Sequence, residues 1–222
     1  MMNKDYILRL AEKFGRALAI ILRLREYNQY EEALIYIDDL FVQSVGLTSR
    51  FINSLSEDML LQTFSPLGIL NVEACLWTAT LLKAEGEIYQ DQGNNDESYY
   101  RYIKSLYLFL AVLLQEQPDN VPEQTQQVTE LLEKLGSYEL SNTVKLKLFA
   151  YYEHLGQYAK AEDTLFELLE SGPVTPTLLG KGQDFYARLL AKSESDLANG
   201  NLAKEEVREG QEQLQRFARQ DE

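Results

Sequence analysis

The chain of 222 residues is long enough to bury a substantial core, and its 45% hydrophobic and 25% charged residues are typical of a folded protein rather than a disordered one. Its net charge of −14 argues against nucleic acid and anionic lipid as partners, because like charges repel. The single cysteine, Cys75, excludes an intramolecular disulfide and a zinc site built from several cysteines, and its apolar surroundings predict a buried thiol.

Apolar residues recur at helical spacing along most of the chain, and no segment alternates as a strand would. The sequence therefore predicts an all-α fold with about eleven helices. The first, residues 3–26, has apolar residues at positions 7, 10, 14, 17, 21 and 24. The others are expected at about 29–45, at two places within 47–65, and at 69–91, 95–117, 122–135, 139–155, 157–171, 176–198 and 201–220.

Local signals mark several helix ends. Ser56 is expected to cap a helix, with Glu57 and Asp58 in its first turn. "QPDNVPEQ" (117–124) is the clearest linker, since it holds two prolines within five residues. We expect one all-helical repeat domain, 1–222, with a subdivision into 1–117 and 122–222 at Pro118–Pro122.

Two hairpin turns share a residue pattern. In "YNQYEEALIYIDDL" (27–40) and "LGQYAKAEDTLFEL" (155–168), the Asn or Gly that ends one helix is followed by Gln, Tyr, two residues and Ala. The stretch "AEGEIYQDQGNNDESYYRYIKS" (84–105) has small residues and tyrosines at corresponding spacings. The three turns lie near positions 28, 93 and 156, so the pattern is irregular.

This pattern resembles the tetratricopeptide repeat, a helical hairpin of about 34 residues. The resemblance implies a right-handed superhelix of antiparallel helical hairpins, with small residues where two helices approach closely and large ones filling the spaces between them. The small positions would be Ala33, Gly86, Ser98 and Ala161, and the large ones Tyr30, Tyr89, Tyr102, Tyr152 and Tyr158. The full sequence also resembles a group of uncharacterised bacterial proteins of unknown function, which implies no activity.

No set of residues forms a catalytic or metal-binding motif. His154 is the only histidine and has no carboxylate at a metal-ligand spacing, so we expect a surface or groove residue. Gly180 and Lys181 in "LLGKGQD" lack the first glycine of a phosphate-binding loop, and we interpret them as a helix interruption. The sequence thus predicts no enzyme, no catalytic residue, no metal and no cofactor.

A basic stripe is expected on the first helix. It consists of Arg9, Lys13, Arg16 and Arg23, which fall within about 80° of one another on a helical projection. Residues 1–25 carry a net charge of +4, which leaves −18 for the remainder. Three interpretations remain open: a solvated face, a docking site for an acidic partner or a second copy, and a contact with a membrane or nucleic acid, which the overall acidity disfavours.

The resemblance also implies a concave face lined by the first helix of each hairpin. The candidate partner-binding residues there are Lys83, Glu87, Gln90, Glu153 and His154. A single lysine is not a clamp for a C-terminal carboxylate, so we do not expect that mode of recognition. The run Tyr99–Tyr102 points in more than one direction, so one of its rings should be exposed and available for protein recognition.

The leading hypothesis is a cytoplasmic, non-enzymatic scaffold that binds an unknown protein or peptide through its concave face. Two alternatives stay open. One is a small-molecule-sensing or enzymatic helical domain with an inter-helix pocket. The other is a self-associating structural protein, a homodimer formed through the heptad face of residues 7–24. The sequence shows no secretory signal, and the apolar run 17–22 is far shorter than the about 20 residues of a spanning helix.

Overall fold

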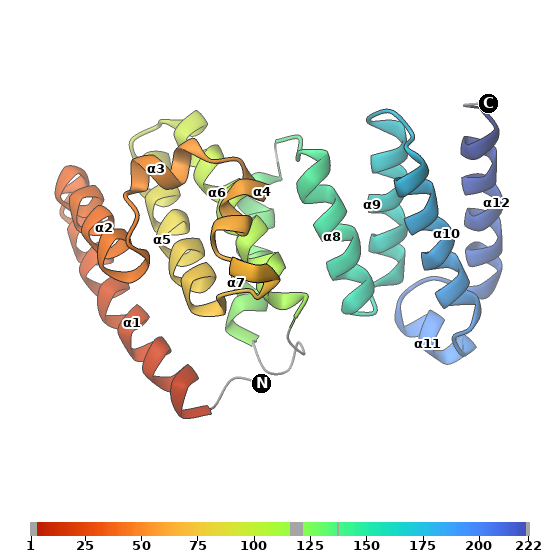
Figure 1. Ribbon diagram of the computed structural model, residues 1–222, viewed down its shortest axis with the longest axis horizontal. Helices are drawn as coiled ribbons and strands as arrows, with labels where there is room; N and C mark the ends of the chain where they lie inside the picture. The colour runs from red at the N-terminus through yellow and green to blue at the C-terminus, as the bar shows by residue number, and fades with distance from the viewer. Residues whose placement is uncertain (1–3, 116–121, 137, 221–222) are drawn as a thin grey trace. The chain divides into compact units, whose positions relative to one another are not determined.

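The computed structural model describes the backbone of residues 4–115, 122–136 and 138–220, and the secondary structure of these segments consists of helices and connecting turns, with no strand (Figure 1). The prediction of an all-α fold is thus confirmed. The chain divides into two compact units, Met1–Glu139 and Leu140–Glu222. Among the described residues, no helix has both the length and the apolar character that crossing a membrane requires.

Twelve α-helices and one short 3-10 helix, η1, make up the described residues. Unit 1 contains α1 (Lys4–Glu26), α2 (Tyr30–Val45), α3 (Ser49–Ser54), α4 (Glu57–Thr63), η1 (Pro66–Gly68), α5 (Val72–Asp91), α6 (Asn95–Leu113) and α7 (Pro122–Leu135). Unit 2 contains α8 (Asn142–His154), α9 (Tyr158–Glu170), α10 (Pro176–Leu190), α11 (Glu194–Asn199) and α12 (Lys204–Gln220).

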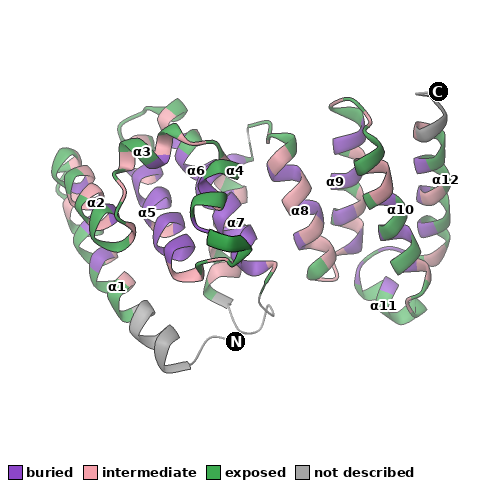
Figure 2. Cartoon of the chain, viewed as in Figure 1, coloured by how far each residue is buried: buried purple, intermediate pink, exposed green. Residues whose placement is uncertain are grey.

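The hairpin of α5 and α6 forms the centre of unit 1, with α2 packed on α5 and α7 packed on α6. Both central helices are buried along most of their length, as the purple ribbon of α5 shows in Figure 2. Leu81, Leu106 and Phe109 are among their fully buried side chains, and Cys75 is buried as expected. Burial of this apolar surface is the main stabilising contribution to the unit.

Unit 2 has a core of its own. The helix pairs α8–α9 and α10–α12 supply it, with Phe149 and Phe185 in edge-to-face contact and Leu165, Leu189 and Leu214 around them. The predicted division at Pro118–Pro122 falls largely on residues 116–121, which lie outside the described segments. The boundary between the compact units follows α7, because that helix packs against α6 of unit 1.

The small residues of the repeat pattern lie in the interior of the fold. Ala33, Gly86, Ser98 and Ala161 are all buried. Gly86 is the closest case: a Cβ atom there would lie 2.5 Å from Cε1 of the buried Tyr102 ring and 3.3 Å from Cβ of Arg101. The predicted close approach of α5 and α6 at Gly86 is confirmed, since only a glycine fits against this ring.

The three pattern-sharing turns also have the same backbone geometry. Asn28, Gly93 and Gly156 take left-handed φ angles of 57°, 75° and 71°. The following amide donates to the carbonyl five residues before it in every case: Gln29 to Leu24 (2.9 Å), Asn94 to Tyr89 (2.8 Å) and Gln157 to Tyr152 (2.8 Å). In each hairpin this hydrogen bond satisfies a carbonyl group at the end of the first of the two helices. That helix therefore ends at the same position relative to the turn in all three hairpins.

Two sequence expectations were wrong. Helix α10 continues through Gly180 and Lys181, and Gly182 makes room for α12, since a Cβ on it would lie 2.9 Å from Cδ2 of Leu214. The helix expected over 176–198 is instead two helices, because the Ser193 side chain caps α11 by accepting from the Asp196 amide (3.1 Å). The cap predicted at Ser56 is confirmed, with its side chain accepting from the Met59 amide (3.3 Å).

Candidate functional site

An open groove of about 940 Å³ lies in unit 1 and is lined by residues of α2, α3, α5 and α6. Helix α3 and the preceding Thr48 form one wall, α2 forms another, and the floor comes from α5 and the first half of α6. These segments are 34–39, 48–54, 85–89 and 97–104, so folding brings together residues that are up to about 70 positions apart.

A buried carboxylate, Glu85 of α5, lies at the floor of this groove, with only 2% of the residue exposed. The hydroxyl of Ser49 donates to its Oε1 (2.5 Å), and the Asn53 side-chain amide donates to its Oε2 (3.3 Å). Burial raises the pKa of Glu85, and this effect exceeds the lowering by the Ser49 bond and the Arg101 charge. Both bonds tie α3 to α5.

Arg101 of α6 is the cation next to Glu85. Its Nε lies 3.6 Å from Glu85 Oε2, its Nη1 pairs with Glu97, and its guanidinium lies 4.7 Å from the centre of the Tyr89 ring. The Nε is buried and makes no hydrogen bond within the described part of the chain. Arg101 is thus neutralised by two carboxylates and fixed in place against an aromatic face.

Lys104 lies one helical turn after Arg101 and also lines the groove. Its Nζ donates to the backbone carbonyl of Asn53 (2.6 Å), near the C-terminal end of α3. The pKa of Lys104 is lowered, chiefly because burial disfavours its charged form.

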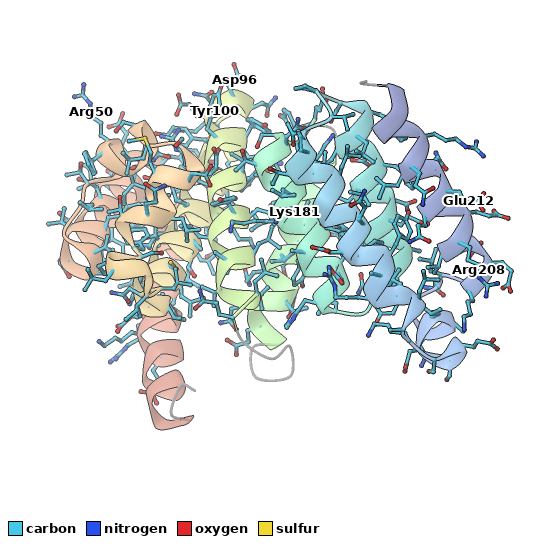
Figure 3. The ribbon with its side chains drawn as sticks, turned by 45° about the vertical axis from the view of Figure 1, so that its right-hand side comes forward. Arg50, Asp96, Tyr100, Lys181, Arg208 and Glu212 are labelled. Carbon is cyan, nitrogen blue, oxygen red and sulfur yellow. The ribbon has the colours of Figure 1, made fainter. Side chains whose placement is uncertain are left out.

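The rim of the groove combines exposed apolar and charged side chains. Ile35 of α2 and Tyr100 of α6 are 65% and 55% exposed, and the exposed ring expected within Tyr99–Tyr102 is therefore Tyr100. Asp38 accepts a hydrogen bond from the Ser49 amide (2.6 Å), while Arg50 is exposed. Figure 3 shows Arg50 and Tyr100 projecting outward at the same end of unit 1.

The groove offers hydrogen-bonding groups on its floor and apolar surface on its rim. This is the composition of a binding site in which a few polar groups fix orientation and apolar contacts add affinity. No group of three or more His, Cys, Asp or Glu side chains within the described segments is arranged to hold a metal ion.

The structure brings Lys83, Glu87 and Gln90 together on one face of α5, where each contacts a neighbouring helix. Lys83 pairs with Glu130 of α7, and Glu87 pairs with Arg25 of α1 (2.6 Å) and Lys134 of α7 (3.7 Å). Gln90 accepts from the Tyr102 hydroxyl (2.7 Å). These polar groups therefore stabilise the packing of α5, and their role in partner binding stays a prediction.

The other two candidates of the concave face lie at the end of α8 in unit 2. Glu153 accepts two hydrogen bonds from Arg188 of α10, at 2.7 and 2.9 Å, whereas His154 is exposed at the end of the helix. Their binding role likewise stays a prediction.

The basic stripe of α1 is exposed at Lys13, Arg16 and Arg23, and the side chain of Arg9 lies outside the described ones. Lys13 and Arg16 also line a smaller hollow of about 390 Å³ next to Trp77. The opposite, apolar face of α1 is covered within unit 1, with Ala17 and Ile21 buried. That part of the heptad face is therefore unavailable for packing against a second copy.

Sequence analysis missed the groove because its residues share no spacing in the chain. One signal was available: Glu85 and Lys104 are charged residues at positions where the neighbouring residues of α5 and α6 are apolar and buried. Charged side chains are rarely buried without a partner, so such positions mark polar networks inside a fold.

Comparison with known proteins gives a family but no activity. No curated protein matches the chain, and no solved structure matches it. One family model matches residues 1–219, nearly the whole length, and it is described as a family of unknown function, DUF6483. The chain therefore belongs to the DUF6483 family.

Proposed function

We propose that this chain is a non-enzymatic binding protein and that the groove of unit 1 takes up a peptide segment of another protein. The observation that carries the proposal is the groove itself: exposed Ile35 and Tyr100 lie above a polar floor fixed by Glu85 and Arg101. Rigid polar groups next to exposed aromatic surface are typical of sites that recognise peptides.

The hairpin geometry supports a relationship to tetratricopeptide-type repeats. Three turns share a left-handed residue and the same main-chain hydrogen bond, and Gly86 meets Tyr102 as the resemblance implies. We extend the proposal to a superhelical arrangement of these hairpins. The proposed site differs from the predicted concave face, because α2, α3 and α6 contribute to it as well as α5.

Selection from a peptide library displayed on phage tests the proposed function. The full chain is immobilised, enriched peptides are synthesised, and their affinities are measured by fluorescence anisotropy. We expect Tyr100→Ala and Ile35→Ser to weaken binding at least tenfold, since both side chains are exposed and removing them should not disturb the core.

Lys181→Ala in unit 2 is the matched control, because Lys181 is an exposed residue remote in sequence from the groove segments. The proposal fails if no peptide is enriched, or if the enriched peptides bind the two groove variants as tightly as the wild type. Equal weakening by the control variant would place the binding surface elsewhere.

A further inference from the structure

Lys104 is a buried cation that forms no ion pair within the described segments of the chain. The residue is 6% exposed, and its one hydrogen bond in the described part of the chain goes to the neutral carbonyl of Asn53. An ammonium group has three donors, so this bond uses only one of them. No ion pair joins Lys104 to a described carboxylate, whereas Arg101 on the same helix lies next to two.

The contact with α3 accounts for part of this arrangement. A cation near the last carbonyls of a helix is favourable, and Lys104 occupies that position at the end of α3. The carbonyl does not neutralise the charge, however, and burying an unpaired charge is costly. The lowered pKa of the lysine reflects the same cost. Lys104 therefore has unused capacity to bind an anion at the groove floor.

The charges around Lys104 limit what kind of anion fits. Glu57, Glu97 and Glu85 all favour the charged form of Lys104 electrostatically, but none of them forms an ion pair with it among the described contacts, and Glu85 and Glu97 lie next to Arg101 instead. Asp38 and Asp39 line the α2 side of the groove and would repel a polyanion. A group with a single negative charge, a carboxylate, suits this site better than a phosphate.

From these observations we infer that the groove selects peptides by an acidic side chain, Asp or Glu, whose carboxylate pairs with Lys104. This inference rests on the proposed function. Ile35 and Tyr100 on the rim would contact the residues that flank the acidic one, while Lys104 provides selectivity at the floor. A charge-assisted hydrogen bond to the buried Lys104 ammonium is stronger than one in water.

The test uses the peptides enriched in the display experiment. We expect them to share an Asp or Glu at one position, and replacing it with Asn or Gln should weaken binding to the wild-type chain at least tenfold. The same replacement should change binding to Lys104→Met less than twofold, because the partner of the carboxylate is then absent. Lys104→Arg keeps the charge and should retain a preference for the acidic peptide.

Two further measurements separate this inference from its alternatives. Trp77 fluorescence in urea shows whether each variant keeps unit 1 folded, since Trp77 is the sole tryptophan and is buried in α5. Peptides with phosphoserine in place of the acidic residue test for a more highly charged ligand. Tighter binding of phosphoserine by the wild type would overturn the choice of a carboxylate.

The outcomes also separate the inference from the proposed function. If enriched peptides lose affinity with Tyr100→Ala but bind equally well with Gln in place of Glu, the groove binds peptides and the role of Lys104 is refuted. If Lys104→Met still discriminates Glu from Gln tenfold while remaining folded, the carboxylate pairs elsewhere and the inference is wrong. If no peptide is enriched, both proposals fail together.

Discussion

The contact between Gly86 and Tyr102 leads to a testable prediction about stability. Whether Gly86→Ala lowers or raises the free energy of unfolding should depend on whether the Tyr102 ring is present. A Cβ at position 86 would lie 2.5 and 2.7 Å from two ring atoms of Tyr102, well inside van der Waals contact. The ring has little room to move, because it is 2% exposed and its hydroxyl donates to Gln90 (2.7 Å). Gly86→Ala must therefore displace α6.

The size of the effect follows from two opposing contributions. Overpacking a tight contact costs about 2–3 kcal/mol, in the upper part of the usual range, because the obstructing group is a fixed ring. Alanine is favoured over glycine inside a helix by about 1 kcal/mol. Gly86→Ala should therefore lower the free energy of unfolding of unit 1 by about 1–2 kcal/mol.

Urea denaturation followed by Trp77 fluorescence measures this change within unit 1. In a Tyr102→Leu background the ring is absent, and Gly86→Ala should then stabilise the unit by up to about 1 kcal/mol. Gly15→Ala in α1 is the control, since nothing lies within 4 Å of the added Cβ, and it should stabilise in both backgrounds. If Gly86→Ala raises the free energy of unfolding of the chain that retains Tyr102, the inference that α5 and α6 pack in close contact at Gly86 is wrong.

Three other substitutions test the polar and packing contacts. Burial raises the pKa of Glu85 above its ordinary 4.5, so the folded state holds the proton more tightly than the unfolded state does. The free energy of unfolding should therefore fall as the pH rises above 4.5. Glu85→Gln removes the titrating group and should flatten this part of a pH–stability profile. Arg25→Ala removes the ion pair with Glu87 and should cost about 1 kcal/mol in urea denaturation, less at high salt. Gly182→Val should cost about 1–3 kcal/mol by pushing against Leu214, measured as a lower midpoint of unit 2 in thermal unfolding followed by circular dichroism.

Local signals in the sequence were enough to predict most helices, because caps and turns act over a few residues. Ser56 and the turn at Gly93 behave as their residue types indicate. Ser193, with an acidic residue three positions later, also carries a capping pattern, but the apolar periodicity of the surrounding stretch favours one continuous helix. A glycine inside a helix costs about 1 kcal/mol, which favours an interruption at Gly180 and Gly182. At Gly182 the absence of a side chain allows close packing against Leu214 and Leu165, a tertiary contact that the local pattern does not reveal.

The groove could not be predicted in the same way. Its floor depends on which charged residues of α5 and α6 face α3, and that is decided by helix packing rather than by neighbouring residues. Lys83 and Glu85 lie two positions apart on α5, yet Lys83 pairs with α7 and Glu85 with α3. A helical projection separates these two directions, but it does not say which neighbour occupies each one.

The polar floor that forms the candidate site is also what holds α3 in place. This helix has six residues and only Ile52 is buried, so neither its own length nor its apolar contacts would keep it helical. Ser49 and Asn53 bind Glu85, and Lys104 binds the carbonyl of Asn53. A ligand carboxylate at Lys104 would therefore act on the same contacts that position α3. Binding in the groove and local stability of α3 should consequently rise and fall together.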